Sequence, residues 1–241
     1  MLSKTQGIVI HAIPYSDTRY MVHIYTNTFG RISCLAKRGG GRKNTMPKVL
    51  FMPLSIINIE IERRNPGSVC RLQEVELACP LARLFADPVK NAIALFIAEI
   101  LFRTLKETGP DAPLFRFLSH SIRLLEDTEA GIANFHLAFL LRLLLHLGIS
   151  PDINSFRESY LFDMRNGIFV ENPPLHKHFL DKEESRIFAK LLRISYENMS
   201  LYTFSRHERV NILDKIITYY RLHMPETPEI KSLPILKSLF D

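Results

Sequence analysis

The chain has 241 residues, of which 46% are hydrophobic and 23% are charged, a composition typical of a soluble globular protein. Its length suffices for one large domain or two small ones, with a core that needs no covalent staples. The three cysteines are an odd number with no close pair in the sequence, which argues against a disulfide framework and against a cysteine-based zinc site.

The net charge of +6 is concentrated at the start of the chain. Residues 1–80 contain 11 Lys and Arg against 5 Asp and Glu, whereas residues 81–241 contain 20 of each. A basic module joined to a neutral one indicates that the first module binds a polyanion. The alternative interpretation is a basic surface that has no partner.

No signal peptide is recognisable at the start of the chain, because no small-residue cleavage site follows the short apolar run. The longest apolar run, residues 137–147, is interrupted by Arg142 and His146 and is too short to span a bilayer. We therefore expect a cytoplasmic protein that does not interact with the membrane.

The first 80 residues are predicted to form strands. The clearest alternation lies in residues 54–62, where Ile57, Ile59 and Ile61 share one face. The other strands are expected at residues 7–13, 19–25, 31–36 and 69–78. Five short strands with one apolar face fit a small closed barrel better than an open sheet, because closure removes exposed edges.

Helical spacing of apolar residues replaces this alternation after Pro80. The pair Asp87-Pro88 is a strong helix start, and Asn166-Gly167 between two apolar runs is a strong hairpin signal. Capping-box patterns begin at Asp181 and Ser205. Helices are predicted at residues 88–109, 113–127, 132–147, 182–196, 206–223 and 230–240, and a hairpin is predicted near 159–171.

The predicted fold class is therefore α+β with two domains. Residues 1–80 form a five-stranded nucleic-acid-binding barrel, and residues 81–241 form an all-α domain with a small β-hairpin insertion near 159–171.

The strongest functional signal is the basic segment that joins two predicted strands at the barrel rim. Its cations flank Gly39, Gly40 and Gly41. Glycines let backbone N–H groups approach a phosphate closely, so the segment is predicted to follow a nucleic-acid backbone. The alternative is a solvated basic loop. The cations of the segment are Lys37, Arg38, Arg42, Lys43 and Lys48.

Other side chains near predicted turns extend this candidate DNA surface. Single-strand binders combine a cationic groove with aromatic faces on which bases stack. Tyr15, Tyr25 and Phe29 lie near turns and are the candidates for stacking, whereas Tyr20 alternates with core positions. The further candidate cations are Arg19, Arg31, Arg63 and Arg64.

No motif in the chain indicates catalysis, a metal or a cofactor. The nine histidines are scattered, and His176 and His178 have no cysteine partner. There is no zinc-protease, nucleophile-elbow or phosphate-loop signature. We predict no catalytic residues and no cofactor, and therefore a protein that is not an enzyme.

The order of several short motifs resembles the RecO family of bacterial recombination mediators. Residues 5–10 resemble that family's first strand, and residues 29–39 resemble its strand that ends in a basic, glycine-containing loop. Residues 143–151 (Leu-Leu-Leu-His-Leu-Gly-Ile-Ser-Pro) are similar to its central helix, and residues 231–233 to its closing Lys-Ser motif. The resemblance spans nearly the whole chain.

The resemblance implies an N-terminal OB-fold, a helical C-terminal domain and a role in DNA repair. It implies binding to single- and double-stranded DNA, annealing of complementary strands, and localisation at the nucleoid. It also implies work with RecR, and in some bacteria RecF, to load RecA onto DNA covered by single-stranded-DNA-binding protein. By motif position, the DNA-binding role falls on Lys37, Arg38, Arg42 and Lys43.

The resemblance also implies contact with the acidic C-terminal tail of single-stranded-DNA-binding protein. Arg123 and Arg142 are the candidates, although Ala133 and Asn134 replace the basic residues expected before the central helix. Many members carry a four-cysteine zinc module after that helix. Residues 152–178 of this chain contain no cysteine, so we expect a metal-free hairpin there.

Two other functions remain open at this point. An adaptor that acts mainly through protein–protein contacts would bind nucleic acid only weakly. An RNA-binding protein is the other alternative, because this barrel fold serves both nucleic acids. Titrations with matched DNA and RNA would separate these alternatives.

Overall fold

The computed structural model describes residues 2–37, 48–63, 65, 67–106, 109–226 and 228–238. The chain divides into two compact units: Met1–Asp127 together with Glu229–Leu239, and Thr128–Pro228. The sequence predicts a domain boundary after residue 80, whereas these compact units divide after Asp127; the boundary at residue 80 stays a prediction. Among the described residues, no helix has the length and apolar character needed to cross a membrane.

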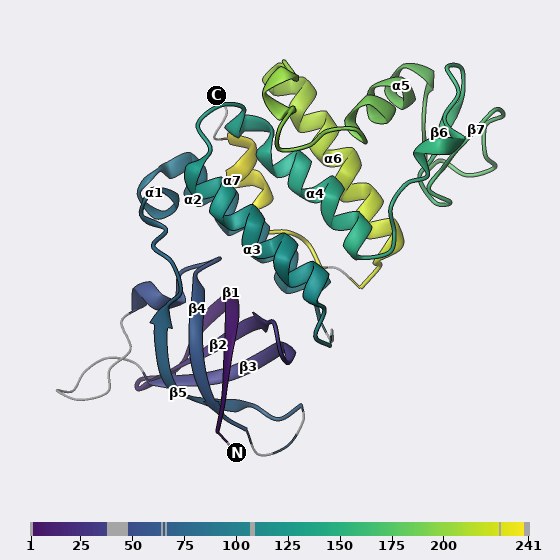
Figure 1. Ribbon diagram of the computed structural model, residues 1–241. Coiled ribbons are helices and arrows are strands. Elements are labelled where there is room, and N and C mark those ends of the chain that lie inside the picture. The colour runs from purple at the N-terminus through teal and green to yellow at the C-terminus, as the bar shows by residue number, and fades with distance from the viewer. Residues whose placement is uncertain are drawn as a thin grey trace. The chain divides into compact units, whose positions relative to one another are not determined.

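A closed barrel of five strands opens the first unit, in the order β1-β2-β3-β5-β4 (Figure 1). This order and the helical region that follows confirm the predicted fold class. The barrel strands are β1 Leu2–Ser16, β2 Arg19–Thr26, β3 Gly30–Lys37, β4 Ile56–Glu62 and β5 Cys70–Leu77.

The alternation of apolar residues explains the barrel core, because most inward positions of the strands are buried. Val22 and Ile24 of β2 face Ile57 and Ile59 of β4 within one apolar cluster. Strand β1 is longer than predicted because it pairs with β4 along its first half and with β2 along its second half. Gly7 lies where both pairings meet, and a Cβ there would overlap the Cγ2 methyl group of Ile24.

The barrel is closed by its shortest pairing, which is also its parallel one. Strands β3 and β5 share two registered pairs, Cys34 with Cys70 and Leu35 with Arg71. The antiparallel seams are longer; β2 and β3 alone share eight registered pairs. The β3–β5 seam is therefore the weakest hydrogen-bonded seam of the barrel.

Helices pack on the barrel within the first unit. The carboxylate of Asp87 accepts hydrogen bonds from the N–H groups of Val89 and Lys90, as the Asp-Pro helix start predicts. The carboxylate of Glu126 accepts bonds from the N–H groups of Arg83 and Leu84, at the start of a short helix that was not predicted. The helices of this unit are α1 Ala82–Ala86, α2 Pro88–Thr104, α3 Ala112–Asp127 and α7 Leu233–Ser238.

The end of the chain returns to the first unit through a carboxylate on α2. Glu99 accepts hydrogen bonds from the backbone N–H groups of Lys231 and Ser232 at 3.0 and 2.8 Å, and from the Ser232 hydroxyl at 2.7 Å. Arg103, one turn along the helix, forms an ion pair with the same carboxylate. These contacts fix α7 beside α2.

The second unit is helical around α4, most of which is buried, as its nearly uniform apolar sequence predicts. Asp181 and Ser205 form the two predicted capping boxes. The predicted hairpin is present, but a third strand, which was not predicted, joins it in the order β7-β6-β8. The elements are α4 Phe135–His146, α5 Lys182–Leu191, α6 Arg206–His223, β6 Leu161–Asp163, β7 Ile168–Val170 and β8 Phe179–Leu180.

Candidate nucleic-acid interface

Two of the predicted DNA-contacting cations lie side by side on the outer face of the barrel. Arg19 is the first residue of β2 and Lys37 is the last residue of β3, and the strand register pairs them directly. Both side chains are exposed. Asp17, in the turn before β2, is the nearest acidic residue in the sequence. Like charges on adjacent strands repel each other, so this pair favours an anionic partner.

A third cation, Arg71, was not predicted and joins this pair through the parallel seam. The register places Arg71 of β5 beside Leu35 of β3, and Leu35 in turn beside Met21 of β2. Arg71 is exposed because its neighbours Cys70 and Leu72 point into the core. We call Arg19, Lys37 and Arg71 the cationic face. Its third member depends on a non-local parallel pairing that no local sequence pattern reveals.

The outer face of the adjacent β4–β5 hairpin carries the opposite charge. The register pairs Glu60 with Glu74 and Asn58 with Glu76, and Glu62 lies beside Arg71. Glu74 and Glu76 are exposed, and Glu60 and Glu62 are half-buried. The barrel surface is therefore polarised: the cationic face lies on β2, β3 and the first residues of β5, and the glutamates lie on β4 and further along β5, with Glu62 and Arg71 at the boundary. A polyanion would be attracted by the cationic face and repelled by the glutamates.

The predicted base-stacking residues differ in exposure. Tyr15, near the end of β1, is 62% exposed and lies close to the turn that leads to Arg19. Phe29 follows the opposite end of β2 and is half-buried, and the guanidinium carbon of Arg63 lies 5.3 Å from its ring centre. Tyr15 is thus the better placed of the two for stacking beside the cationic face.

The prediction that Tyr25 offers a stacking face is wrong. Its side chain is completely buried, and its ring centre lies 6.5 Å from that of Phe115 on α3. Burial, with a smaller contribution from the charge of Asp111, raises the pKa of Tyr25 to about 12. Tyr25 points outward from the barrel, but a helix covers that part of the outer face.

Arg31 also lies on the outer face of the barrel, beneath α2. Its Nη1 atom donates hydrogen bonds to the carbonyl oxygens of Phe102 and Leu105 at 2.8 and 3.0 Å. Its guanidinium carbon lies 4.6 Å from the centre of the Phe102 ring. This arrangement satisfies the free carbonyl groups at the end of α2. Arg31 therefore holds a helix to the barrel, and we leave it out of the candidate interface.

The remaining predicted cations of the barrel lie outside what the structure describes. Arg38, Arg42, Lys43 and Arg64 fall in undescribed segments, and for Lys48 only the backbone, at the start of a 3₁₀ helix (Lys48–Phe51), is described. Their role in DNA binding stays a prediction. Lys37 is the described residue from which the basic segment continues.

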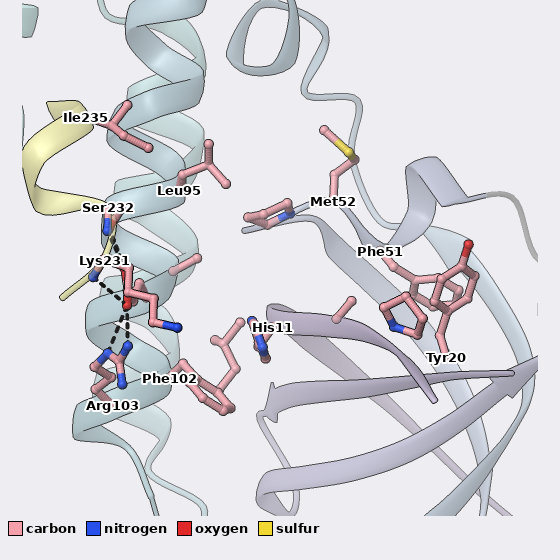
Figure 2. A pocket seen from close by; sticks show the side chains of 16 residues that line it. His11, Tyr20, Phe51, Met52, Leu95, Phe102, Arg103, Lys231, Ser232 and Ile235 are labelled. Atoms are coloured by element: carbon pink, nitrogen blue, oxygen red, sulfur yellow. Dashed lines mark hydrogen bonds and ion pairs between the residues drawn. The ribbon is translucent and has the colours of Figure 1, made fainter. Parts of the chain in front are cut away.

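An apolar groove of about 790 Å³ lies between the barrel and the α2–α7 pair (Figure 2). Tyr20 and Phe51 line it on the barrel side, and Leu95 and Phe102 line it on the α2 side. Lys231, in the segment before α7, also lines the groove. The carboxylate of Glu99 lines it too and accepts a hydrogen bond from the hydroxyl group of Ser232. Arg19 does not line this groove, because it points to the face of β2 opposite to Tyr20.

The two arginines predicted to contact an acidic tail lie in different compact units. Arg123 on α3 is exposed, and its guanidinium lies beside the thiol of Cys79. Arg142 on α4 lies 5.9 Å from the ring centre of Tyr196 and is half-buried. Within the described residues, its Nε atom has no hydrogen-bond partner. Leu145, one turn further along α4, is 63% exposed.

Comparison with known proteins finds that the N-terminal and C-terminal parts of the chain both match models of one protein family. Residues 1–80 match the family model "Recombination protein O N terminal", and residues 86–234 match "Recombination protein O C terminal". The chain is 44% identical to the DNA repair protein RecO of Phocaeicola vulgatus and 41% identical to that of Bacteroides fragilis. It is 34% identical to the RecO protein of Flavobacterium psychrophilum. Each of these matches covers the full length of both chains.

Proposed function

Because the chain belongs to the RecO family of DNA repair proteins, we propose that it is a DNA-binding recombination mediator whose barrel captures DNA on its cationic face. The observation that carries this proposal is the polarised barrel: Arg19, Lys37 and Arg71 on β2, β3 and β5, against a row of glutamates on the β4–β5 hairpin. The basic segment that continues from Lys37 extends this surface in the sequence.

The mechanism is electrostatic capture without turnover. Cations on the barrel neutralise phosphates and release their counterions, which favours binding at low salt. Tyr15 beside the cationic face provides a ring on which an unpaired base can stack. Two strands whose charge is neutralised on one protein repel each other less, and complementary strands then pair. Annealing is therefore the activity that we expect of the purified protein.

The mediator role requires protein partners, which we propose by family membership. RecR, and in some bacteria RecF, would act with this protein to load RecA onto single-stranded DNA. The acidic tail of single-stranded-DNA-binding protein would contact Arg142, whose half-buried guanidinium lies near the exposed Leu145. A cation beside an exposed apolar side chain suits a peptide that carries both carboxylates and apolar residues. Arg123 is a second candidate for this contact, in the other unit.

The test of DNA binding compares an exposed lysine of the cationic face with an exposed lysine elsewhere on the barrel. Lys37→Glu reverses a charge on the cationic face, and Lys4→Glu reverses one on the exposed β1 position beside Glu60. The Lys4 side chain is 82% exposed and Lys37 is also exposed, so both variants should fold. Fluorescence anisotropy with single-stranded DNA across a salt series gives the affinity and its salt dependence.

We expect Lys37→Glu to weaken binding about tenfold near 0.1 M salt, which corresponds to about 1.4 kcal/mol. It should also lower the slope of log affinity against log salt by about 0.7 for each phosphate that the variant no longer neutralises. Lys4→Glu should change binding by less than about twofold. Equal losses in the two variants would contradict the assigned face, and tighter binding of matched RNA than of DNA would favour the RNA-binding alternative.

A further inference from the structure

The core of the barrel contains two cysteines that are distant in the sequence and adjacent in the fold. Cys34 of β3 and Cys70 of β5 are registered partners across the parallel seam, and their exposed fractions are 0% and 1%. Neighbouring strands lie about 4.7–4.9 Å apart, and disulfide-bonded cysteines have Cα separations of about 4.4–6.8 Å. We propose that Cys34 and Cys70 form an oxidisable dithiol whose disulfide bond covalently closes the barrel.

The two thiols are already in contact on the inner side of the seam. Both residues belong to one buried cluster with Val22 and Ile61, so their Cβ atoms point to the same side of the sheet. A hydrogen bond joins the two sulfur groups. Bridging them requires a change of side-chain torsion angles and no rearrangement of strands.

The environments of the two thiols give them different roles. The hydrogen bond from Cys34 and the positive charge of Arg63, opposed by burial, lower the pKa of Cys70 to about 7. The same hydrogen bond and burial raise the pKa of Cys34 well above its usual value. Cys70 is the first residue of β5, beside the exposed Val69, so a peroxide reaches its sulfur first, and the lowered pKa favours the reactive thiolate there; Cys34 then resolves the product.

The oxidant that completes the reaction is a peroxide. The Cys70 thiolate attacks one peroxide oxygen, the O–O bond breaks, and the oxygen that leaves is protonated; with hydrogen peroxide the products are a sulfenic acid and water. The sulfur of Cys34 then attacks the Cys70 sulfur, losing its proton, and hydroxide leaves as a second water. Two thiols lose two electrons and two protons in total, and one hydrogen peroxide is reduced to two waters.

Access to Cys70 is provided by opening at the end of the seam. Cys70 is the first residue of β5 and follows Val69, which is 51% exposed. The seam has two registered pairs, so it separates at lower cost than the long antiparallel seams. Cys79 lies outside the barrel strands, where burial raises the pKa of its thiol. The dithiol, and not Cys79, is therefore the site of fast oxidation.

The experiment treats the full chain with hydrogen peroxide near neutral pH. Free thiols are then alkylated in denaturant, and the disulfide is located by peptide mass spectrometry. The Cys79→Ala variant, which retains both members of the dithiol, is the matched control. We expect a Cys34–Cys70 crosslink in the wild type and at the same rate in Cys79→Ala.

The oxidised protein should also have a higher midpoint of thermal unfolding, which a dithiol reductant returns to its original value. The crosslink encloses residues 35–69 and so restricts the unfolded chain. The proposal is overturned if Cys34 and Cys70 stay alkylatable under conditions that oxidise Cys79, or if Cys70 proceeds to sulfinic acid without crosslinking. Both measurements use the wild-type chain, so they do not depend on the folding of a core variant.

Discussion

Glu99 connects two parts of the first unit that are far apart in the sequence. Burial alone would raise the pKa of this carboxyl group, but hydrogen bonds from Ser232, Lys231 and Arg103 lower it to about 2. Because the folded state holds the carboxylate charged, these contacts stabilise the fold at pH values above the ordinary pKa of 4.5. The Glu99 side chain therefore holds the segment at Lys231 and Ser232 in place, and the stabilisation that it provides is lost when acid protonates its carboxylate.

We predict that Glu99→Gln lowers the free energy of unfolding by about 1–3 kcal/mol at pH 7, because an amide loses the charge-assisted hydrogen bonds. As the pH falls from about 4.5 towards 2, the wild type should lose this advantage and the two proteins should converge. Urea denaturation at several pH values measures both effects. Glu171→Gln, at an exposed position directly after β7, is the control and should match the wild type throughout. A constant difference down to pH 2 would show that Glu99 acts through packing alone.

At the scale of elements, the outer face of the β2–β3 ladder is shared between two tasks. The rows that contain Tyr25, His23 and Arg31 lie beneath α2 and α3. The rows that contain Arg19 and Lys37 are exposed. One strand pair thus anchors helices at one end and presents cations at the other.

This division predicts opposite effects for two arginines on adjacent strands. Arg31→Met should lower the free energy of unfolding by about 1.5–3 kcal/mol, because it leaves two carbonyl groups at the end of α2 without donors, and should leave DNA affinity nearly unchanged. Arg19→Met should weaken DNA binding severalfold with little loss of stability. Thermal denaturation and DNA titration of both variants measure the contrast. Similar behaviour of the two variants in both assays would refute it.

The strands and most helices could be predicted because local patterns determine them. Alternating isoleucines specify β4, and the Asp-Pro start and the two capping boxes specify the beginnings of α2, α5 and α6. The ends of other elements depend on distant partners. Helix α7 begins at Leu233 and not at Ile230, and Glu99, which is distant in the sequence, accepts hydrogen bonds from the N–H groups of Lys231 and Ser232 just before it.

Helix α5 ends before its predicted limit for a similar reason. The side chain of Asn198 accepts a hydrogen bond from the N–H group of Ser195 and donates one to the carbonyl group of Arg193. These bonds favour a turn over continued helix.

The candidate interface could likewise be predicted only in part. The exposure of Arg19 follows from its position in the strand, whereas the burial of Tyr25 and the placement of Arg71 follow from tertiary contacts. A sequence pattern gives the face of a strand but not the element that covers it.

At the scale of the whole molecule, the first unit is discontinuous in the sequence. Residues 128–228 separate Asp127 from the segment that begins at Glu229, and that segment belongs with the barrel and α2. Both ends of the chain are therefore needed to complete the first unit.

Ending the chain after Pro228 should weaken the first unit although the second unit keeps its elements. The truncation removes α7 and the Lys231 and Ser232 donors to Glu99, so amide hydrogen exchange in α2 should become at least about tenfold faster, while exchange in α4 and α6 stays within about twofold. A chain that ends at Ser238 is the matched control and should exchange like the full chain. Unchanged protection of α2 in the shorter chain would show that the tail is dispensable.

The return of the tail also sets the order in which the protein can be completed during synthesis. The barrel leaves the ribosome first, but the hydroxyl and amide donors of Ser232 lie 133 positions after Glu99 and are synthesised much later. Until then the carboxylate of Glu99 lacks these donors. A nascent chain that stalls before Ser232 therefore carries an unfinished first unit, and its more frequent opening should make that unit more sensitive to proteolysis than in the full chain.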